Sequence, residues 1–561
     1  LAELWQAFDV DSRNETKHAS KLIARMYTAM EQAYPAETDS KARDHEISVT
    51  LARLLFLMFA DDTGMWPDED VFENFILEHT DADGTDIGGR LTALFDYLDT
   101  KPAERADARS EFDRFRYVNG GIFKERLTLP KINAEFRKAI LDACDRDWKT
   151  ISPAIFGSMF QSVRDAKTRR ELGEHYTSEE NILKTLNPLF LDDLRAEFQH
   201  IRTLGKYEAD RLGKLREKLG QIRYLDPACG CGNFIIVAYR ELRDLELAIM
   251  ERLQEITGDQ AKLLANYGLQ ISLDHFYGIE IDEWPARIAE TAMFLIDRQC
   301  DLKLTESLGW APERLPIEEQ ATVLVANALW TDWSQVVDPS EGEVIIAGNP
   351  PFVGPKERTS DQTAALRHVW GANYDGFLDY VTGWQVKSME FYGGAPGIWA
   401  FVSTNSISQG QAVPTLWGRI YASGWRVKFA YRTFPWTSEA SGVAAVHCVI
   451  VGFTKDARPR PLLFDRSGNP EGERVDEINA YLVDGPSILV KKRMHPISPA
   501  LPEVVAGSKA VDWGFLTVRP DEYEAVASDP VASAFLRPYK GGEELINDLD
   551  RWCLWLVGGD L

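Results

Sequence analysis

The sequence has few cysteines and no long uncharged hydrophobic run. Six cysteines are spread over 561 residues, which excludes the dense disulfide framework of a small secreted domain. Cys229 and Cys231 form a C-x-C pair, but no second Cys/His pair stands at zinc-finger spacing. We therefore expect reduced thiols and no metal site. The apolar run from Leu51 to Ala60 is interrupted by Arg53 and is shorter than the roughly 20 residues that span a membrane.

The start of the chain also lacks the features of a secretion signal. It has neither the basic start nor the apolar segment of a signal peptide, and it does not begin with methionine. We expect a cytoplasmic protein and a chain that was trimmed at its start.

Positive charge is scarce as well. The chain has 62 Lys and Arg against 87 Asp and Glu, a net charge of −25, which argues against a protein that coats nucleic acid through its whole surface. A local basic cleft remains compatible with this charge. Its candidate residues are Arg164, Lys167, Arg169 and Arg170, then Lys356 and Arg358, then Lys491, Lys492 and Arg493.

Hydrophobic periodicity divides the chain. Apolar residues recur at helical spacing as far as about Ala154, whereas short β-branched runs alternate with helical patterns after Arg223. The alternation predicts an α/β fold with a Rossmann-like, doubly wound sheet, preceded by an all-helical domain. The strand candidates are IRYLD, FYGIE, TVLVA, EVIIA, IWAFVS and VHCVIVGF, and the helix candidates are 233–250 and 284–299. We expect a helical domain over 1–151, the α/β domain over 152–454, and a connecting segment with the start of a truncated further domain over 455–561.

The first motif is a glycine-rich turn after a strand, from Tyr224 to Phe234. Gly230 and Gly232 lack the Cβ atom that would block a cofactor from approaching the backbone. Asp226, at the end of the strand, can hold the ammonium group of a methionine moiety, and Asn233 is suited to cap the helix that follows.

A second acidic strand end lies some fifty residues later, in FYGIEID. A carboxylate at this position of a doubly wound fold accepts hydrogen bonds from ribose hydroxyls, so Glu280 is the candidate ribose ligand. The residues that flank these groups complete the candidate cofactor site: Pro227, Ala228, Phe234 and Ile281.

The third motif, Gly348-Asn-Pro-Pro-Phe352, follows the apolar strand EVIIA. Pro350 and Pro351 make a rigid turn, which would hold the Asn349 side chain and the Pro350 carbonyl as a fixed pair of acceptors. Such a pair fits an aromatic amine, whose lone pair it would release for direct displacement. Phe352 would stack on the base once the base has left the duplex.

These motifs resemble those of gamma-type DNA amino-methyltransferases. In that group a threonine after a GEHY-like motif meets the methionine carboxylate, which implies this role for Thr177. An Asp or Asn after a later strand contacts the cofactor adenine, which implies this role for Asn327 and its neighbour Ala328. The cofactor that the resemblance implies is S-adenosyl-L-methionine, and the reaction is methylation of the N6 amine of adenine.

The segments ISPAIFGSMFQSV, RRELGEHYTSEENI, AGNPPFVG, FVSTNSISQGQ and FLRPYKG are together similar to the MmeI-type restriction-modification enzymes. That family joins a nuclease, a helical spacer, a methyltransferase and a target-recognition domain in one chain. The resemblance implies double-stranded DNA as partner, phage defence as the setting, and Phe434 in the Phe434-Pro-Trp436 motif as a second ring beside the flipped base. Lys356 and Arg358 are the implied DNA contacts.

Three departures accompany this resemblance. Cys231 stands where the family commonly has serine, and both residues are small. The cleavage domain of that family carries an acidic pair with a Glu-x-Lys motif, and no such set of residues stands before Ala154. We therefore expect any nuclease domain or subunit to lie outside this chain. We also expect the recognition domain to be truncated. Asp379 with Gln385 and Lys387 fits a relaxed nuclease pattern, but the pattern falls between methyltransferase motifs in an expected helix, and we assign it no nuclease role.

Alternatives remain open from the residues alone. A cytosine-N4 methyltransferase uses similar groups, a protein glutamine methyltransferase uses an Asn-Pro-Pro-aromatic turn, and a non-catalytic DNA-binding subunit could retain the fold. Cytosine-C5 chemistry is excluded, because it needs a cysteine nucleophile after a proline and no cysteine here follows one.

Overall fold

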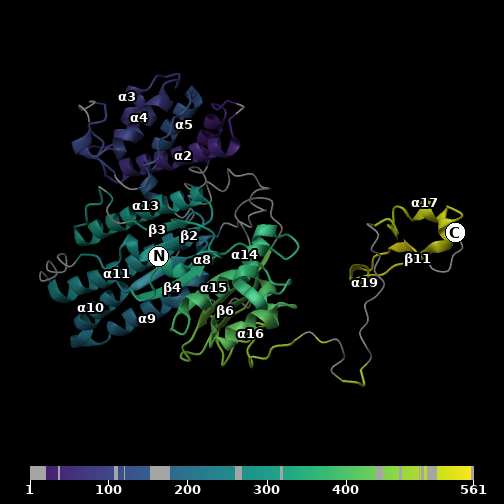
Figure 1. Ribbon diagram of the computed structural model, residues 1–561. Helices are drawn as coiled ribbons and strands as arrows, with labels where there is room; N and C mark the ends of the chain where they lie inside the picture. Colours follow the sequence, from purple (N-terminus) through teal and green to yellow (C-terminus); the bar gives the residue numbers. More distant parts are fainter. Residues whose placement is uncertain are drawn as a thin grey trace. The chain divides into compact units, whose positions relative to one another are not determined.

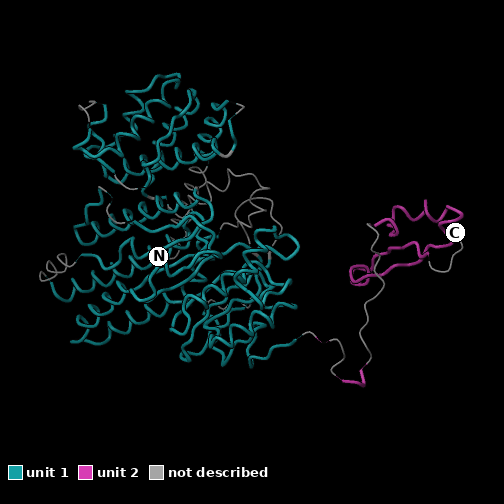
Figure 2. Tube along the Cα trace, viewed as in Figure 1, with its two compact units in different colours: residues 1–491 teal, residues 492–561 magenta. Residues whose placement is uncertain are grey.

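The computed structural model describes residues 21–35, 38–105, 111–118, 121–151, 177–258, 268–315, 317, 320–436, 446–465, 471–491, 493, 498–501 and 514–556. The chain forms two compact units, residues 1–491 and residues 492–561 (Figure 2). The helical region and the α/β region therefore belong to the same unit. The domain boundaries expected at 151 and 454 stay predictions.

The N-terminal part of the first unit is helical, as the sequence predicted (Figure 1). Residues 21–31 are helical, and four more helices follow: α2 (Ser40–Asp62), α3 (Val71–His79), α4 (Ile87–Asp99) and α5 (Ala134–Cys144). The Asp39 side chain caps α2 by accepting a hydrogen bond from the Ala42 amide at 3.0 Å. Every residue from Leu51 to Ala60 is buried, which identifies α2 as the central helix of this region.

No helix in the described part of the chain is both long and apolar enough to cross a membrane. The apolar stretch of α2 is accounted for by its packing, since it contacts α3, α5 and the long helix α13 (Glu283–Leu308) of the α/β region.

A nine-stranded sheet forms the centre of the α/β region. Its strands are β1 (Ile222–Asp226), β2 (Phe276–Glu280), β3 (Thr322–Val325), β4 (Glu343–Gly348), β5 (Ile398–Thr404), β6 (Arg426–Trp436), β7 (Val446–Thr454), β8 (Leu462–Phe464) and β9 (Glu473–Arg474). They lie in the order β3-β2-β1-β4-β5-β7-β6-β8-β9. Strands β1 to β5 run parallel, and β7 is antiparallel to both of its neighbours.

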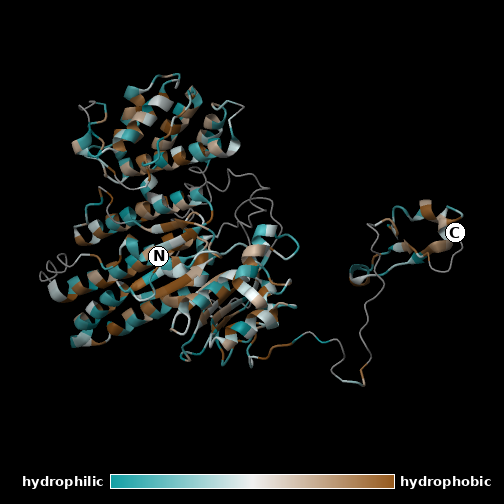
Figure 3. Ribbon diagram, in the orientation of Figure 1, coloured by the Kyte–Doolittle hydropathy of each residue, from teal (hydrophilic) through white to brown (hydrophobic). Residues whose placement is uncertain are grey.

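Helices cover both faces of this sheet, because successive strand residues point to opposite sides. Tyr224 belongs to the core that includes α8 (Glu179–Leu186), α9 (Asp192–Ile201), α10 (Glu208–Leu219), α11 (Asn233–Thr257) and α13. Leu225 belongs to the core that includes α14 (Ser360–Trp370), α15 (Thr382–Tyr392) and α16 (Val413–Ala422). Figure 3 shows the hydrophobic residues concentrated on the strands between these helices. The predicted Rossmann-like fold is confirmed.

The helical region and the sheet region share polar as well as apolar contacts. The Arg298 side chain of α13 donates to the Thr63 carbonyl at 2.6 Å, and Arg116 pairs with Glu313 at 2.8 Å. Beneath them lies a buried ion-pair network of two arginines and two aspartates: Arg243, Arg314, Asp297 and Asp301. The network ties α11 and α13 to the segment that returns toward the helical region.

The second unit, described by itself, contains a small antiparallel sheet. Its strands β10 (Thr517–Val518), β11 (Leu536–Pro538) and β12 (Trp552–Leu554) lie in the order β10-β12-β11. Three short helices accompany them: α17 (Tyr523–Ala527), α18 (Ala532–Phe535) and α19 (Gly542–Asn547).

Candidate active site

The sequence motifs meet at the edge of the sheet where the strand order reverses. Strand β1 has β2 on one side and β4 on the other, and all three are parallel. Asp226, Glu280 and Gly348 are the last residues of these strands. In open α/β sheets, ligands bind at this carboxyl edge, next to the reversal point.

The glycine-rich turn is fitted closely to its neighbours. Gly232 has a φ of +87° and is the N-cap of α11, and a Cβ atom at this residue would lie 2.9 Å from the Ala289 Cβ of α13. The expectation that Asn233 caps α11 was wrong, because the left-handed Gly232 occupies the cap position and Asn233 is already helical. The buried Asn233 Oδ1 has no hydrogen-bond partner among the residues that the structure describes.

The turn also leaves room for a ligand. Gly230 has a φ of +54°, and no atom of the described residues lies within 4 Å of the position that its Cβ would take. The turn is held at its other side by the Cys229 amide, which donates to the Ile279 carbonyl at 3.1 Å. Phe234 is buried in the core below. The arrangement is a rigid turn with an open side at Gly230.

Asp226 is a buried carboxylate at the centre of this edge. Its residue is 1% exposed, and its Oδ1 accepts a hydrogen bond from the Ala228 amide at 3.0 Å. Burial raises the pKa of Asp226 to about 8, and the negative charge of Glu280 raises it further, whereas the Ala228 amide works against this shift. A cation bound here would favour the ionised form.

Glu280 connects two turns. Its Oε2 accepts from the Gly230 amide at 2.9 Å, and its Oε1 accepts from the Asp282 amide at 3.0 Å. These two bonds orient the carboxylate at the end of β2. The adjacent Ile281 is 57% exposed.

Asn327 follows β3 and lies next to this pair of turns. The Ala326 amide donates to the Glu280 carbonyl at 2.8 Å, and Asn327 Oδ1 accepts from the Leu329 amide at 3.0 Å. Ala328 is buried beside it. Burial raises the pKa of Tyr380 to about 12, and a hydrogen bond with the Asn327 side chain works against that shift.

The Asn-Pro-Pro-Phe turn begins directly against Asp226. A Cβ atom added to Gly348 would stand only 2.2 Å from Asp226 Oδ1, so the end of β4 is packed on the carboxylate. Asn349 Nδ2 donates a hydrogen bond to Thr177 Oγ1 at 2.8 Å. Pro350 is buried and Pro351 is half-buried.

The bond between Asn349 and Thr177 joins residues that are 172 positions apart. Thr177 is buried and precedes α8, whereas Gly173 to Tyr176 lie outside the described residues. The amide nitrogen of Asn349 donates to the threonine, and the amide oxygen is the acceptor end of the same group. The two motifs act as one unit.

Two aromatic side chains lie toward the same edge. Phe352 is half-buried and contacts the cores on both faces of the sheet. Phe434 is half-buried in β6, opposite Cys448 of β7, and the Lys184 Nζ lies 5.6 Å from the centre of its ring. An irregularity in the pairing of β6 separates Phe434 from Tyr431 and sets the direction of the Phe434 side chain. The Trp436 side chain lies outside the described part of the structure.

The basic candidates differ in their surroundings. Lys356 is exposed, whereas the Arg358 guanidinium donates to the Gly376 carbonyl at 3.2 Å. The cluster from Arg164 to Arg170 lies outside the described residues, as does Lys492. The described residues contain no group of three or more His, Cys, Asp or Glu side chains placed to hold a metal ion.

Sequence reasoning missed three residues that support this edge. Trp384 of α15 donates from Nε1 to the Pro227 carbonyl at 2.9 Å, Tyr380 lies beside Asn327, and Asp379 binds the end of β5. The expected helix over Asp379 begins later, at Thr382. Of the three, only Asp379 belonged to a recognisable sequence pattern, and that pattern suggested a nuclease.

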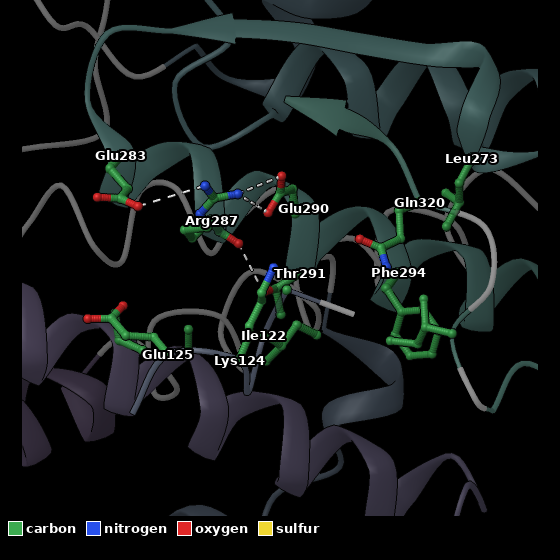
Figure 4. Close-up of a pocket in the computed structure, with 14 residues that line it drawn as sticks. Ile122, Lys124, Glu125, Leu273, Glu283, Arg287, Glu290, Thr291, Phe294 and Gln320 are labelled. Atoms are coloured by element: carbon green, nitrogen blue, oxygen red, sulfur yellow. Dashed lines mark hydrogen bonds and ion pairs between the residues drawn. The ribbon is translucent and has the colours of Figure 1, made fainter. Parts of the chain in front are cut away.

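A separate cavity of about 370 Å³ lies between α13 and the helical region. Glu283, Arg287 and Glu290 of α13 point toward one another in its lining, and Lys124 and Glu125 also line it (Figure 4). Arg287 pairs with Glu290 at 2.8 Å. None of the motif residues lines this cavity, so it is distinct from the candidate active site.

The fold and the strand-end residues define a Rossmann-like methyltransferase domain joined to a helical domain. Comparison with known proteins agrees with this class. Residues 202–465 match the family description MmeI, DNA-methyltransferase domain; residues 45–123 match MmeI, helicase spacer domain; and residues 484–561 match MmeI, target recognition domain.

Two relatives cover nearly the whole chain. The solved structure of the type IIL restriction-modification enzyme MmeI in complex with DNA superposes with a TM-score of 0.87 and 39% identity, over 96% of this chain and 71% of that one. DNA methyltransferase A of Bacillus subtilis (strain 168) is 35% identical over 96% of this chain. The chain belongs to the MmeI family of restriction-modification enzymes, and it spans 60% of the length of DNA methyltransferase A.

Proposed function

We propose that this chain transfers a methyl group from S-adenosyl-L-methionine to the N6 amine of adenine in duplex DNA, as the modification activity of a restriction-modification system. One observation carries the proposal. The amine-binding turn at Asn349 follows a glycine that is packed on the buried Asp226 carboxylate, so the acceptor for the amine and the acceptor for the cofactor's ammonium are neighbours.

The residues at the strand ends fit this cofactor. Asp226 is a buried acid whose pKa is raised to about 8, and an ammonium group would offset the burial of its charge. Gly230 leaves open space at the turn, Asn233 offers a buried amide oxygen, and Glu280 is aligned by two backbone amides. S-adenosyl-L-methionine, when bound, supplies an electrophilic methyl group on a sulfonium.

The chain's own residues would prepare the amine. The Asn349 amide oxygen and the Pro350 carbonyl accept its two hydrogens, which draws the nitrogen lone pair out of the ring and aims it in one direction. The Asn349 to Thr177 bond holds the amide in that orientation. Attack of the nitrogen on the methyl carbon would break the methyl–sulfur bond and leave a neutral thioether, and one proton of the amine would pass to water. Because the amine is itself the nucleophile, no covalent enzyme intermediate is needed.

The base must leave the duplex to reach this turn. Phe352 and Phe434 offer two half-buried aromatic rings at the same edge, and stacking on such rings returns part of the few kcal/mol that unpairing and unstacking require. Residues 484–561, which match the target recognition domain, would recognise the DNA sequence. Lys356 and Arg358 remain our candidates for DNA contacts beside the turn.

The test begins with the wild-type protein. Unmethylated DNA is incubated with methyl-labelled cofactor, the modified positions are mapped by long-read sequencing, and the labelled nucleoside is identified. We expect N6-methyladenine at one short sequence. Labelled N4-methylcytosine, label in protein instead of DNA, or cofactor binding without any transfer would each overturn the adenine assignment.

Variants of Asn349 then test the mechanism. Asn349→Ala removes the acceptor and should lower kcat by roughly 10²- to 10³-fold, as loss of a transition-state hydrogen bond does in other enzymes, with little change in cofactor affinity. Asn349→Asp keeps an oxygen at the same position and should retain more activity. Asn373→Ala, at an exposed asparagine of the same region, is the control. Wild-type turnover in Asn349→Ala would refute the assigned role.

A further inference from the structure

Asp379 is a buried acid that the mechanism above does not use. Its residue is 6% exposed and lies in the segment that precedes α15. Its sequence neighbours suggested a nuclease pattern, but Lys387 lies 5.9 Å from the Trp333 ring and the Gln385 side chain donates to Ser403 at 3.3 Å. Asp379 has different partners.

The Asp379 carboxylate collects hydrogen bonds from several elements. Its Oδ2 accepts from Thr404 Oγ1 at 2.9 Å and from Ser406 Oγ at 3.2 Å, and its Oδ1 accepts from the Val381 amide at 3.3 Å. Burial raises the pKa of Asp379, and hydrogen bonds from Thr404, Val381, Ser406 and the Val353 amide work against that shift. Four donors therefore face a group that has only acceptor sites.

Two of these donors, Val353 and Thr404, are connected to the aromatic residues of the proposed base pocket. Val353 directly follows Phe352, and its carbonyl accepts from the Tyr380 amide at 3.2 Å, so Val353 is attached to the Asp379 segment at both its amide and its carbonyl. Thr404 ends β5 and is paired with Cys448 of β7, which is itself paired with Phe434 of β6. One carboxylate is thus bonded to the residue next to Phe352 and to the end of β5, which is joined to Phe434 through the intervening strand β7.

We propose that Asp379 is a positioning residue that sets the separation of Phe352 and Phe434, and so the width of the slot that receives the flipped base. This inference rests on the proposed function. It assigns Asp379 no contact with base or cofactor, because its carboxylate oxygens are occupied by donors of the protein itself. A change at Asp379 should alter base capture and turnover while cofactor binding, which depends on Asp226 and Glu280, persists.

The test compares Asp379→Ala and Asp379→Asn with the wild-type full-length protein. Three quantities are measured: kcat for methyl transfer, the Kd for S-adenosyl-L-methionine, and the fluorescence of a duplex that carries 2-aminopurine at the mapped target adenine. In Asp379→Ala we expect kcat to fall about 10- to 100-fold, the range that misplacement of reacting groups by about 1 Å produces. The fluorescence rise on binding should be reduced, and the cofactor Kd should change less than about twofold.

Asp379→Asn should restore part of the loss. Its oxygen can accept from the backbone amides, and its NH2 group can donate to the Thr404 and Ser406 hydroxyls, which can rotate to accept. Ser406→Ala removes a single donor and should lower kcat by only a few-fold. These two variants carry the test if Asp379→Ala does not fold.

Glu246→Gln is the matched control. Glu246 is another fully buried carboxylate, which accepts from Arg216 and from the Gln270 and Ile271 amides away from the strand ends that form the site. It should lower thermal stability without changing kcat or the 2-aminopurine signal. Folded Asp379 variants with wild-type kcat and fluorescence would overturn the positioning role alone. A wild-type protein that transfers no methyl group to DNA would overturn the proposed function and this inference with it.

Discussion

Replacing Gly348 with alanine should displace the Asp226 carboxylate while leaving the sheet in place. The new Cβ atom would stand 2.2 Å from Asp226 Oδ1, 2.7 Å from Cγ and 3.1 Å from Oδ2, far inside van der Waals contact. Strands β1 and β4 are hydrogen-bonded neighbours over four residue pairs, so the strands resist separation. The carboxylate is therefore the group that must turn away.

The size of the effect follows from what the carboxylate would lose. Turning breaks its 3.0 Å hydrogen bond from the Ala228 amide and moves the charge away from the open side of the turn. A hydrogen bond to a charged group contributes about 1.5–3 kcal/mol, and each 1.4 kcal/mol changes an affinity about tenfold. We expect binding of S-adenosyl-L-methionine to weaken roughly 10- to 100-fold. Overpacking should also lower the free energy of unfolding by about 1–3 kcal/mol.

Isothermal titration of the cofactor into wild type, Gly348→Ala and Gly354→Ala measures this effect. Gly354 lies in the same loop, and a Cβ atom there meets nothing within 4 Å among the described residues, so its replacement should leave the cofactor Kd unchanged. If Gly348→Ala binds the cofactor as tightly as Gly354→Ala does, then Asp226 does not hold the ammonium group, or the carboxylate has a second favourable position.

Two further outcomes can be measured by urea unfolding. The pKa of Asp226 is raised from an ordinary 3.8 to about 8, so the folded protein holds a proton that the unfolded chain releases, and the free energy of unfolding should fall as pH rises from about 4 to about 8. Asp226→Asn should lack this part of the pH dependence, and parallel curves for the two proteins would contradict the assignment. Asp301→Ala should lower the free energy of unfolding by about 3–5 kcal/mol, because it leaves Arg243 and Arg314 in a buried network without one of their acids. Asp210→Ala, at an exposed helix pair with Lys214, should have little effect; equal losses in both variants would show that the buried network is not special.

The strand ends could be predicted from the sequence because each is marked locally. The runs IRYLD and FYGIE coincide with β1 and β2, and EVIIA with all but the last residue of β4. Apolar, β-branched runs that end in an acid or a glycine turn have few other interpretations. Helices α11 and α13 were expected but are longer than predicted, since their last turns are more polar and carry no early stop signal.

Other features depend on contacts that no local pattern contains. Strand β6 begins with alternating charged and apolar residues, from Arg426 to Phe429, but it includes Pro435, which argues against a strand inside a sheet. Pro435 nevertheless pairs with His447 of β7, beyond the register shift between Tyr431 and Phe434. The cap of α11 depends on the left-handed backbone of Gly232. The bond between Asn349 and Thr177 depends on how distant segments meet.

The two acids at the ends of β1 and β2 affect how a charged ligand would bind. Burial raises the pKa of Asp226, the nearby charge of Glu280 raises it more, and no basic side chain of the described residues opposes these effects. Ionisation of Asp226 is therefore unfavourable unless a cation lies beside it. A cationic ligand would favour the ionised form, because its charge offsets the burial of the carboxylate. The raised pKa of Asp226 and the preference that we propose for a cationic cofactor therefore share one physical origin, a buried acid with no opposing basic side chain among the described residues.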